Sequence, residues 1–98
     1  MNLNNFTIRA QEAVQKAQEI ALEQQHPSVE NVHLMKGILD ADEHIVPYLL
    51  KILNVNTDSF YKALDKMLGS LPRVTGGEQY LSAEASKALQ KAVSFARD

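Results

Sequence analysis

The feature that most constrains this 98-residue sequence is a pattern of apolar and small residues that occurs twice, offset by 75 positions. In each copy the spacing is that of one face of an α-helix. The first copy consists of Phe6, Ala10, Ala13, Val14, Ala17 and Ala21, and the second of Leu81, Ala85, Ala88, Leu89, Ala92 and Ala96. Because self-similarity at a fixed offset is the signature of repeat architectures, the sequence predicts one helical repeat followed by the first helix of a second.

Two observations bear on whether this repeat is genuine. Six positions are identical between 6–21 and 81–96, but four of them are alanines, which any two alanine-rich amphipathic helices share. The Gln-Lys pair at 15–16 and again at 90–91, and the matching cap residues Thr7 and Ser82, carry more weight. The remaining helices of a second repeat would begin near residue 103, so we expect this chain to be a fragment of a longer protein.

The periodicity before the second copy predicts four helices, which makes the fold class all-α. The first helix covers 6–24 with Thr7 as its N-cap, and Ser28 is expected to cap the second helix. Gly37 lies inside the second helix, where glycine destabilises by about 1 kcal/mol relative to alanine. We therefore expect two helices to cross closely at Gly37.

Shorter segments complete the first repeat. A helix over 46–53 accommodates Pro47 only in its first turn, and Asn54 is suited to a left-handed C-terminal cap. A further helix opens at Asn56 or Thr57 and stops between Gly69 and Pro72. The predicted organisation is a four-helix repeat over 1–72, an inter-repeat linker over 73–80 and the first helix of a second repeat over 81–98.

Composition excludes several classes of partner. A formal net charge of -2 supplies no positive field for phosphate backbones or anionic lipids, so we expect no nucleic-acid and no membrane partner. The apolar runs are too short for a secretory signal or a membrane span. The absence of cysteine suits a reducing compartment, and we expect a cytoplasmic protein.

No catalytic or cofactor motif is present in the sequence. The three histidines, His26, His33 and His44, include no pair four residues apart on a helix, so a structural or surface role is favoured over metal binding. Neither a glycine-rich phosphate-binding loop nor a nucleophile elbow occurs. We therefore expect no catalytic residue, no metal and no cofactor in this chain.

The last helix has more apolar residues than one narrow face can hold. Leu81, Leu89, Val93 and Phe95 are spread around it, so part of this set should face a seam or a groove. Two interpretations remain open at this point. Either helices of a longer parent protein cover the whole set, or the set lines a functional binding groove.

Three features together resemble the N-terminal domain of the Clp (Hsp100) ATPases, over the whole chain. These are the opening segment Phe6-Thr7-Ile8-Arg9-Ala10-Gln11-Glu12-Ala13, the segment Val29-Glu30-Asn31-Val32-His33-Leu34-Met35-Lys36-Gly37-Ile38-Leu39, and the repeat at an offset of 75 residues. The linker from Leu71 to Gly77 is more similar to that of ClpB, the disaggregating branch, than to those of ClpA and ClpC, which feed a protease.

The resemblance implies a double four-helix repeat above a hexameric ATPase ring. Such a domain engages unfolded or aggregated polypeptide before the ring threads it, in cooperation with co-chaperones. The implied binding site is an apolar groove near the start of the first helix. Thr7 matches a capping position at that groove, and Leu81, Leu89 and Val93 are the apolar candidates to line it, with capping and packing as the alternative role of each residue. ATP and magnesium belong to ATPase modules that this chain lacks.

Two alternatives to substrate binding follow from the same residues. The chain could be the adaptor-docking domain of a protease-linked Clp ATPase of the ClpA or ClpC type. It could also be a non-catalytic helical module that forms homo-oligomers through the exposed face of its last helix. An enzyme ranks last, because the sequence contains no catalytic constellation.

Overall fold

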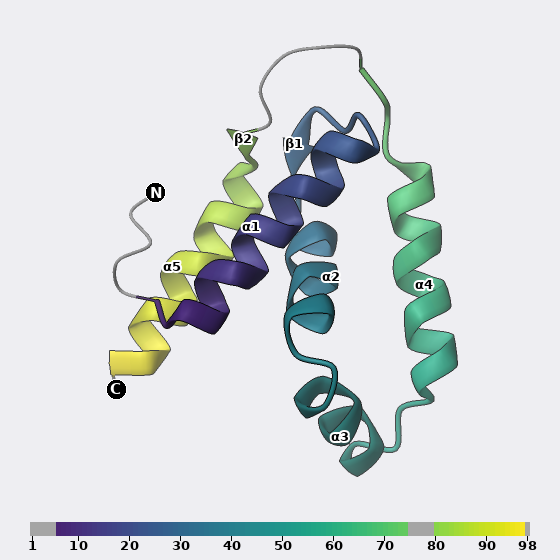
Figure 1. Ribbon diagram of the computed structural model, residues 1–98, viewed down its shortest axis with the longest axis vertical. Helices are drawn as coiled ribbons and strands as arrows, with labels where there is room; N and C mark the ends of the chain where they lie inside the picture. Colours follow the sequence, from purple (N-terminus) through teal and green to yellow (C-terminus); the bar gives the residue numbers. More distant parts are fainter. Residues whose placement is uncertain (1–5, 75–79, 98) are drawn as a thin grey trace.

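The computed structural model describes residues 6–74 and 80–97. Within these residues the chain forms five α-helices and a pair of two-residue β-strands (Figure 1). In chain order they are α1 (Ile8–Glu23), β1 (Ser28–Val29), α2 (Asn31–Ala41), α3 (Ile45–Ile52), α4 (Thr57–Ser70), β2 (Tyr80–Leu81) and α5 (Ala83–Arg97). The predicted all-α class is confirmed, with the short strand pair as an unpredicted addition.

Helix α1 forms where small residues share one helical face. The hydroxyl of Thr7 accepts a hydrogen bond from the backbone N–H of Ala10 at 3.1 Å, which confirms Thr7 as the N-cap. Past the end of the helix, Gln25 turns the chain with a left-handed φ of 59°. The buried face consists of Ala13, Val14, Ala17, Ile20 and Ala21. Its small side chains let a second helix approach closely.

Helix α2 does not begin where the sequence predicted. Ser28 is not its cap, because Ser28 lies in β1, where the backbone is extended and paired with β2. The strands run parallel, with Ser28 opposite Tyr80 and Val29 opposite Leu81. The N-cap of α2 is Glu30, whose backbone N–H donates to Nδ1 of His33 at 2.8 Å. The strand pair thus shifts the start of α2 by two residues.

Helices α3 and α4 agree closely with their predicted ranges. Asn54 adopts a left-handed φ of 60° after α3, as expected. Oδ1 of Asn56 accepts from the backbone N–H of Ser59 at 2.9 Å, which makes Asn56 the cap of α4. The helix continues through Gly69 and has Leu71 as its C-cap.

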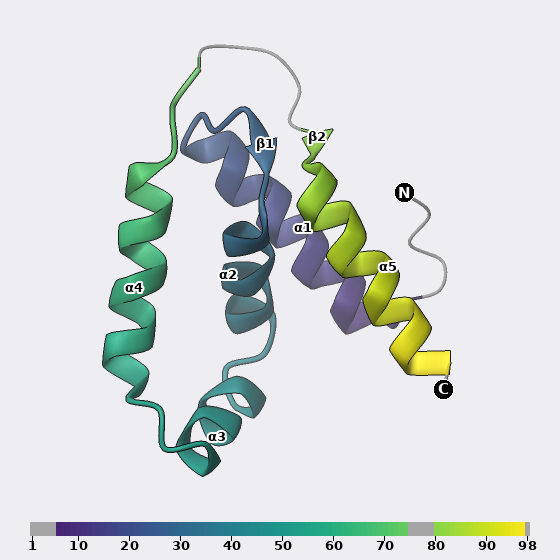
Figure 2. The ribbon, with the colours of Figure 1, turned by 180° about the vertical axis from the view of Figure 1, so that it is seen from behind.

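Helix α5 begins after β2. The hydroxyl of Ser82 accepts from the backbone N–H of Ala85 at 3.0 Å, while the N–H of Ser82 donates to the carbonyl of Val29 at 2.9 Å. The starts of α2 and α5 are therefore joined through the strand pair. Of the expected linker over 73–80, residues 75–79 lie outside the described residues. Figures 1 and 2 show α5 running in the opposite direction to α1.

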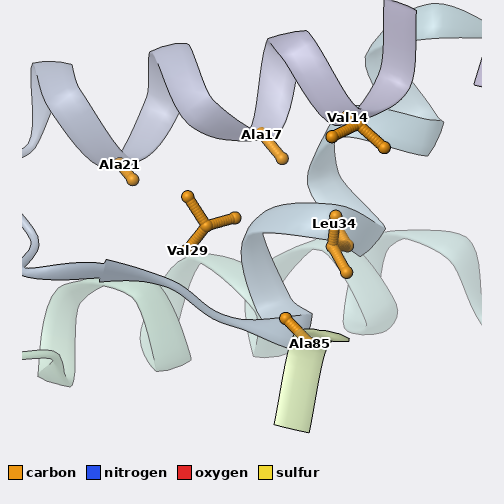
Figure 3. Packing of buried hydrophobic residues seen from close by; sticks show 6 residues of the cluster. All are labelled: Val14, Ala17, Ala21, Val29, Leu34 and Ala85. Atoms are coloured by element: carbon orange, nitrogen blue, oxygen red, sulfur yellow. The ribbon is translucent and has the colours of Figure 1, made fainter. Parts of the chain in front are cut away.

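Helix α2 stands at the centre of the fold, between two apolar clusters. The first cluster joins α1, β1, α2 and α5 (Figure 3) and consists of Val14, Ala17, Ala21, Val29, Leu34 and Ala85. The second joins α1, α2 and α4 and consists of Ile20, Val32, Leu39, Leu64 and Leu68. Figure 2 shows the consequence, with α4 and α5 on opposite sides of α2.

The close crossing predicted at Gly37 is present. A Cβ atom added to Gly37 would overlap the backbone carbonyl oxygen of Ala13 and would lie 3.1 Å from the backbone nitrogen of Ala17. Any side chain at this position would push α2 away from α1. None of the helices in the described part of the chain is long and apolar enough to cross a membrane.

Candidate binding groove

An apolar groove of about 530 Å³ lies between α1, α2 and α5, next to the start of α1. Such a volume falls in the range of sites that accept small molecules or a few side chains. Its lining comes from all three helices and from Phe6 and Thr7, which precede α1: Phe6, Thr7, Ala10, Ala13, Val14, Asn31, Leu34, Met35, Ile38, Ala88, Leu89, Ala92, Val93 and Ala96.

Among the residues that the structure describes, the lining contains no charged side chain. Thr7 and Asn31 are its polar members, and the hydroxyl oxygen of Thr7 already accepts the capping hydrogen bond from Ala10. A groove of this kind offers little directional hydrogen bonding and no ion pair. It suits apolar side chains of a partner, which gain free energy by leaving water.

The structure brings three of the four predicted site residues together. Thr7, Leu89 and Val93 all line the groove, with Thr7 at the start of α1 and the other two on α5. Leu81 lies elsewhere, in β2, where it packs half-buried against the first apolar cluster. Phe95 is 74% exposed and belongs neither to the groove lining nor to the first apolar cluster. Binding by any of these residues stays a prediction.

Sequence reasoning missed the wall that α2 contributes. Leu34, Met35 and Ile38 line the groove, and Ile38 is 42% exposed. The available signal was the width of the apolar stripe on α2. Val32 and Leu39 already fill the cluster shared with α4, and Met35 packs against that cluster, so Leu34 and Ile38 must face a different side.

The histidines are placed as structural or surface residues, as expected, but two of them meet. His26 and His33 are 1% and 0% exposed, and Nδ1 of His26 lies 2.7 Å from Nε2 of His33. Burial lowers the pKa of each imidazole below its ordinary value of 6.5, because the charged form loses its water. The Arg73 guanidinium lowers the pKa of His26 further, and His26 lowers that of His33. The Leu68 carbonyl raises the pKa of His26, and the Glu30 carboxylate raises the pKa of His33.

Across residues 6–74 and 80–97, no three side chains of His, Asp or Glu gather closely enough to hold a metal ion. A second hollow, polar and next to the start of α3, includes Arg9 and Asp42. Both of these side chains form hydrogen bonds with the backbone. Arg9 donates to the carbonyl of Ala41 at 2.8 Å, and Oδ1 of Asp42 accepts from the backbone N–H groups of His44 and Ile45.

Residues 5–98 match the model of the Clp repeat (R) N-terminal domain. The chain belongs to the Clp repeat N-terminal domain family. Among its relatives, the chaperone protein ClpB of Bacteroides thetaiotaomicron is 37% identical over 98 residues, which is 100% of this chain and 11% of the relative.

Two further ClpB relatives show the same relationship. That of Porphyromonas gingivalis is 40% identical over 92 residues, or 94% of this chain and 11% of the relative. That of Vibrio vulnificus is 41% identical over 76 residues, or 78% of this chain and 9% of the relative. This Clp repeat domain therefore spans about a tenth of the length of the ClpB chaperones that it matches.

Proposed function

We propose that this Clp repeat domain engages unfolded or aggregated polypeptide through the groove between α1, α2 and α5. It would do so as the N-terminal part of a ClpB-type disaggregase. The observation that carries the proposal is the groove itself, which is open, apolar and uncharged. An unfolded chain differs from a folded one in presenting apolar side chains, and this surface is matched to that difference.

The make-up of the groove favours loose recognition over tight recognition. Met35 on α2 is flexible and polarisable, while Ala88 and Ala92 on α5 leave space for side chains of different shapes. With Thr7 and Asn31 as the polar members among its described lining residues, the groove has little means of discriminating between sequences. Weak, adaptable binding is what a domain needs when its substrate must later be released.

The proposed roles of the predicted residues follow from their places. Leu89 and Val93 would form the α5 wall that contacts substrate, and Thr7 would hold the start of α1 at the rim through its cap. Leu81 would act indirectly, by fixing β2 and the start of α5 against the first apolar cluster.

Membership of the family suggests how this domain is placed within a longer protein. We propose that residues 1–72 form the first repeat, 73–80 the linker and 81–98 the first helix of a second repeat. The longer protein would be a cytoplasmic hexamer that binds ATP and magnesium in separate modules and cooperates with co-chaperones. Several copies of a weak site around one ring would raise the effective concentration of substrate at its entrance.

A titration followed by fluorescence anisotropy tests the proposal. A labelled, permanently unfolded polypeptide is titrated with the unaltered chain, with Val93→Ser and with Val55→Ser. Val93 lines the groove, whereas Val55 follows α3 and is 39% exposed. We expect weak binding by the unaltered chain, at least several-fold weaker binding by Val93→Ser and unchanged binding by Val55→Ser. Equal loss in both variants, or no binding by the unaltered chain, would contradict the proposal.

Two controls separate the alternatives. A folded protein of similar size replaces the unfolded polypeptide in the same titration, and stronger binding of the folded protein would favour adaptor docking. Sedimentation of the chain alone across a concentration series detects homo-oligomers. A chain extended through a second repeat tests whether later helices cover the groove, because coverage would abolish binding that the 98-residue chain shows.

A further inference from the structure

His26 and His33 form a buried pair that does not line the groove. His26 lies between α1 and β1, and its backbone N–H donates to the carbonyl of Ala21 at 2.9 Å. His33 lies in the first turn of α2. Their rings are inclined at 56° with centroids 5.0 Å apart, and Nδ1 of His26 is 2.7 Å from Nε2 of His33. The pair therefore connects the end of α1 to the start of α2.

The hydrogen bonds fix the proton positions of the neutral pair. The backbone N–H of Glu30 donates to Nδ1 of His33 at 2.8 Å, so this nitrogen carries no proton. His33 must then carry its proton on Nε2, from which it donates to Nδ1 of His26. His26 in turn carries its own proton on Nε2. That nitrogen is buried and has no hydrogen-bond partner among the described residues.

An additional proton has no acceptable position in this arrangement. On Nδ1 of His26 it would face the N–H of His33, and on Nδ1 of His33 it would face the N–H of Glu30. Each case sets two donors against each other at 2.7 or 2.8 Å. The pair can become charged only if one of these two contacts opens.

The surrounding groups do not compensate for a charge on the pair. The charged groups that act on it are Arg73, from the segment after α4, and Glu30, before α2. Arg73 repels an imidazolium. Glu30 favours one on His33, but its Oε1 already accepts from the hydroxyl of Ser28 at 2.9 Å. The backbone carbonyl of Leu68, near the end of α4, raises the pKa of His26, but burial and Arg73 outweigh it and the pKa is lowered.

We propose that the His26–His33 pair is an acid-sensitive latch, which holds the start of α2 against the end of α1 while both imidazoles are neutral and opens when the pair takes up a proton. The turn that opens also lines the groove, so the consequence for binding rests on the proposed function of the groove. Asn31 and Leu34 belong to the same first turn of α2 and line the groove. Mild acid would therefore loosen the α2 wall of the groove.

Nitrogen NMR of the imidazoles in the unaltered chain is the direct test. At pH 7.5 we expect both rings neutral, with Nδ1 unprotonated in each. Intrinsic amide exchange itself depends on pH. On acidification, the amide of Leu34 should exchange with solvent at least about tenfold faster than this intrinsic dependence predicts. The proposal is overturned if either ring carries its proton on Nδ1, or if both rings titrate while the Leu34 amide remains protected.

Unfolding in urea provides the second test, with matched variants. Two buried histidines that are neutral in the folded state and charged in the unfolded state reduce the folding equilibrium constant by up to about 100-fold per pH unit below pH 6.5. For the unaltered chain, we expect the folding equilibrium constant to fall more than tenfold between pH 6 and pH 5. In His26→Asn, the Asn oxygen can replace Nδ1 as acceptor, so the fall should be smaller.

The control for these variants is His44→Asn, which removes an exposed histidine before α3. This variant should show the same fall in the folding equilibrium constant as the unaltered chain. A fall of less than about threefold in the unaltered chain, or an equal reduction in His44→Asn and His26→Asn, would overturn the proposal. If His26→Asn does not fold, the NMR measurement on the unaltered chain decides.

Discussion

Thr7 and Ser82, 75 residues apart, cap their helices in the same way. The Thr7 hydroxyl accepts from the N–H of Ala10 at 3.1 Å, and the Ser82 hydroxyl accepts from the N–H of Ala85 at 3.0 Å. The same offset relates Ala17, which is fully buried, to Ala92, which lines the groove. The repeat thus reproduces the local structure of a helix start, while the surroundings of the two helices differ.

Removing either cap should destabilise the chain. Thr7→Ala and Ser82→Ala are each expected to lower the free energy of unfolding by about 1 kcal/mol, because one backbone N–H at a helix start loses its acceptor. Urea denaturation followed by circular dichroism measures the change. Thr7→Ser keeps the hydroxyl and should stay close to the unaltered chain. An equal loss in Thr7→Ser would show that the methyl group, not the cap, matters there.

The helix crossing at Gly37 should not tolerate a methyl group. Gly37→Ala places Cβ against the backbone carbonyl of Ala13, which cannot rotate away as a side chain can. We expect the free energy of unfolding to fall by about 1–3 kcal/mol, as is typical of overpacking. Thermal unfolding of the purified variants gives the comparison.

The matched control is Gly69→Ala in α4, where nothing lies within 4 Å of the added Cβ. There alanine should raise stability by up to about 1 kcal/mol, because it favours the helical backbone. If both substitutions stabilise the chain, the packing of α1 on α2 at Gly37 is looser than the structure indicates.

Much of this fold could be predicted because its signals are local. The caps at Thr7 and Asn56, the left-handed Asn54 and the crossing at Gly37 each depend on the chemistry of a residue and its near neighbours. Ser28 was misassigned because a short parallel pairing with Tyr80, more than fifty residues away, takes its backbone into β1. Pairing between distant segments leaves no periodic signal in so short a strand.

Part of the groove could also be predicted from local signals. The excess of apolar residues on the last helix predicted that some of them face a seam or a groove, and Leu89 and Val93 line a groove. The contribution of α2 depends on which of its faces α4 occupies, which is a tertiary arrangement. The contact between His26 and His33 also escaped sequence reasoning, because a turn and a strand separate the two residues and their spacing fits no helical pattern.

The start of α3 should depend on pH in strongly acidic solution. Hydrogen bonds from the N–H groups of Ile45 and His44 lower the pKa of Asp42 below its ordinary value of 3.8. The charged carboxylate therefore stabilises the fold above pH 3.8, and this contribution is lost as the pH falls through the pKa of the folded state. Asp42→Asn can keep the acceptor oxygen but should lose this pH dependence.

Urea unfolding of the unaltered chain and of Asp42→Asn between pH 5 and pH 2.5 checks the prediction. The difference in stability between the two proteins should shrink towards the acid end of this range. The histidine pair, whose pKa values lie below 6.5, is present in both proteins, so its effect cancels in the difference between them. A difference that stays constant down to pH 2.5 would show that the Asp42 charge contributes nothing.

Methyl NMR can show residue by residue whether the groove binds unfolded polypeptide. An unfolded polypeptide is added to a chain labelled at its Ile, Leu and Val methyl groups. We expect shifts at Leu34, Leu89 and Val93 in the groove, and none at Ile45, Ile52 and Leu53, which are exposed on or next to α3. Shifts confined to the residues around α3, with the groove resonances unchanged, would contradict the proposal.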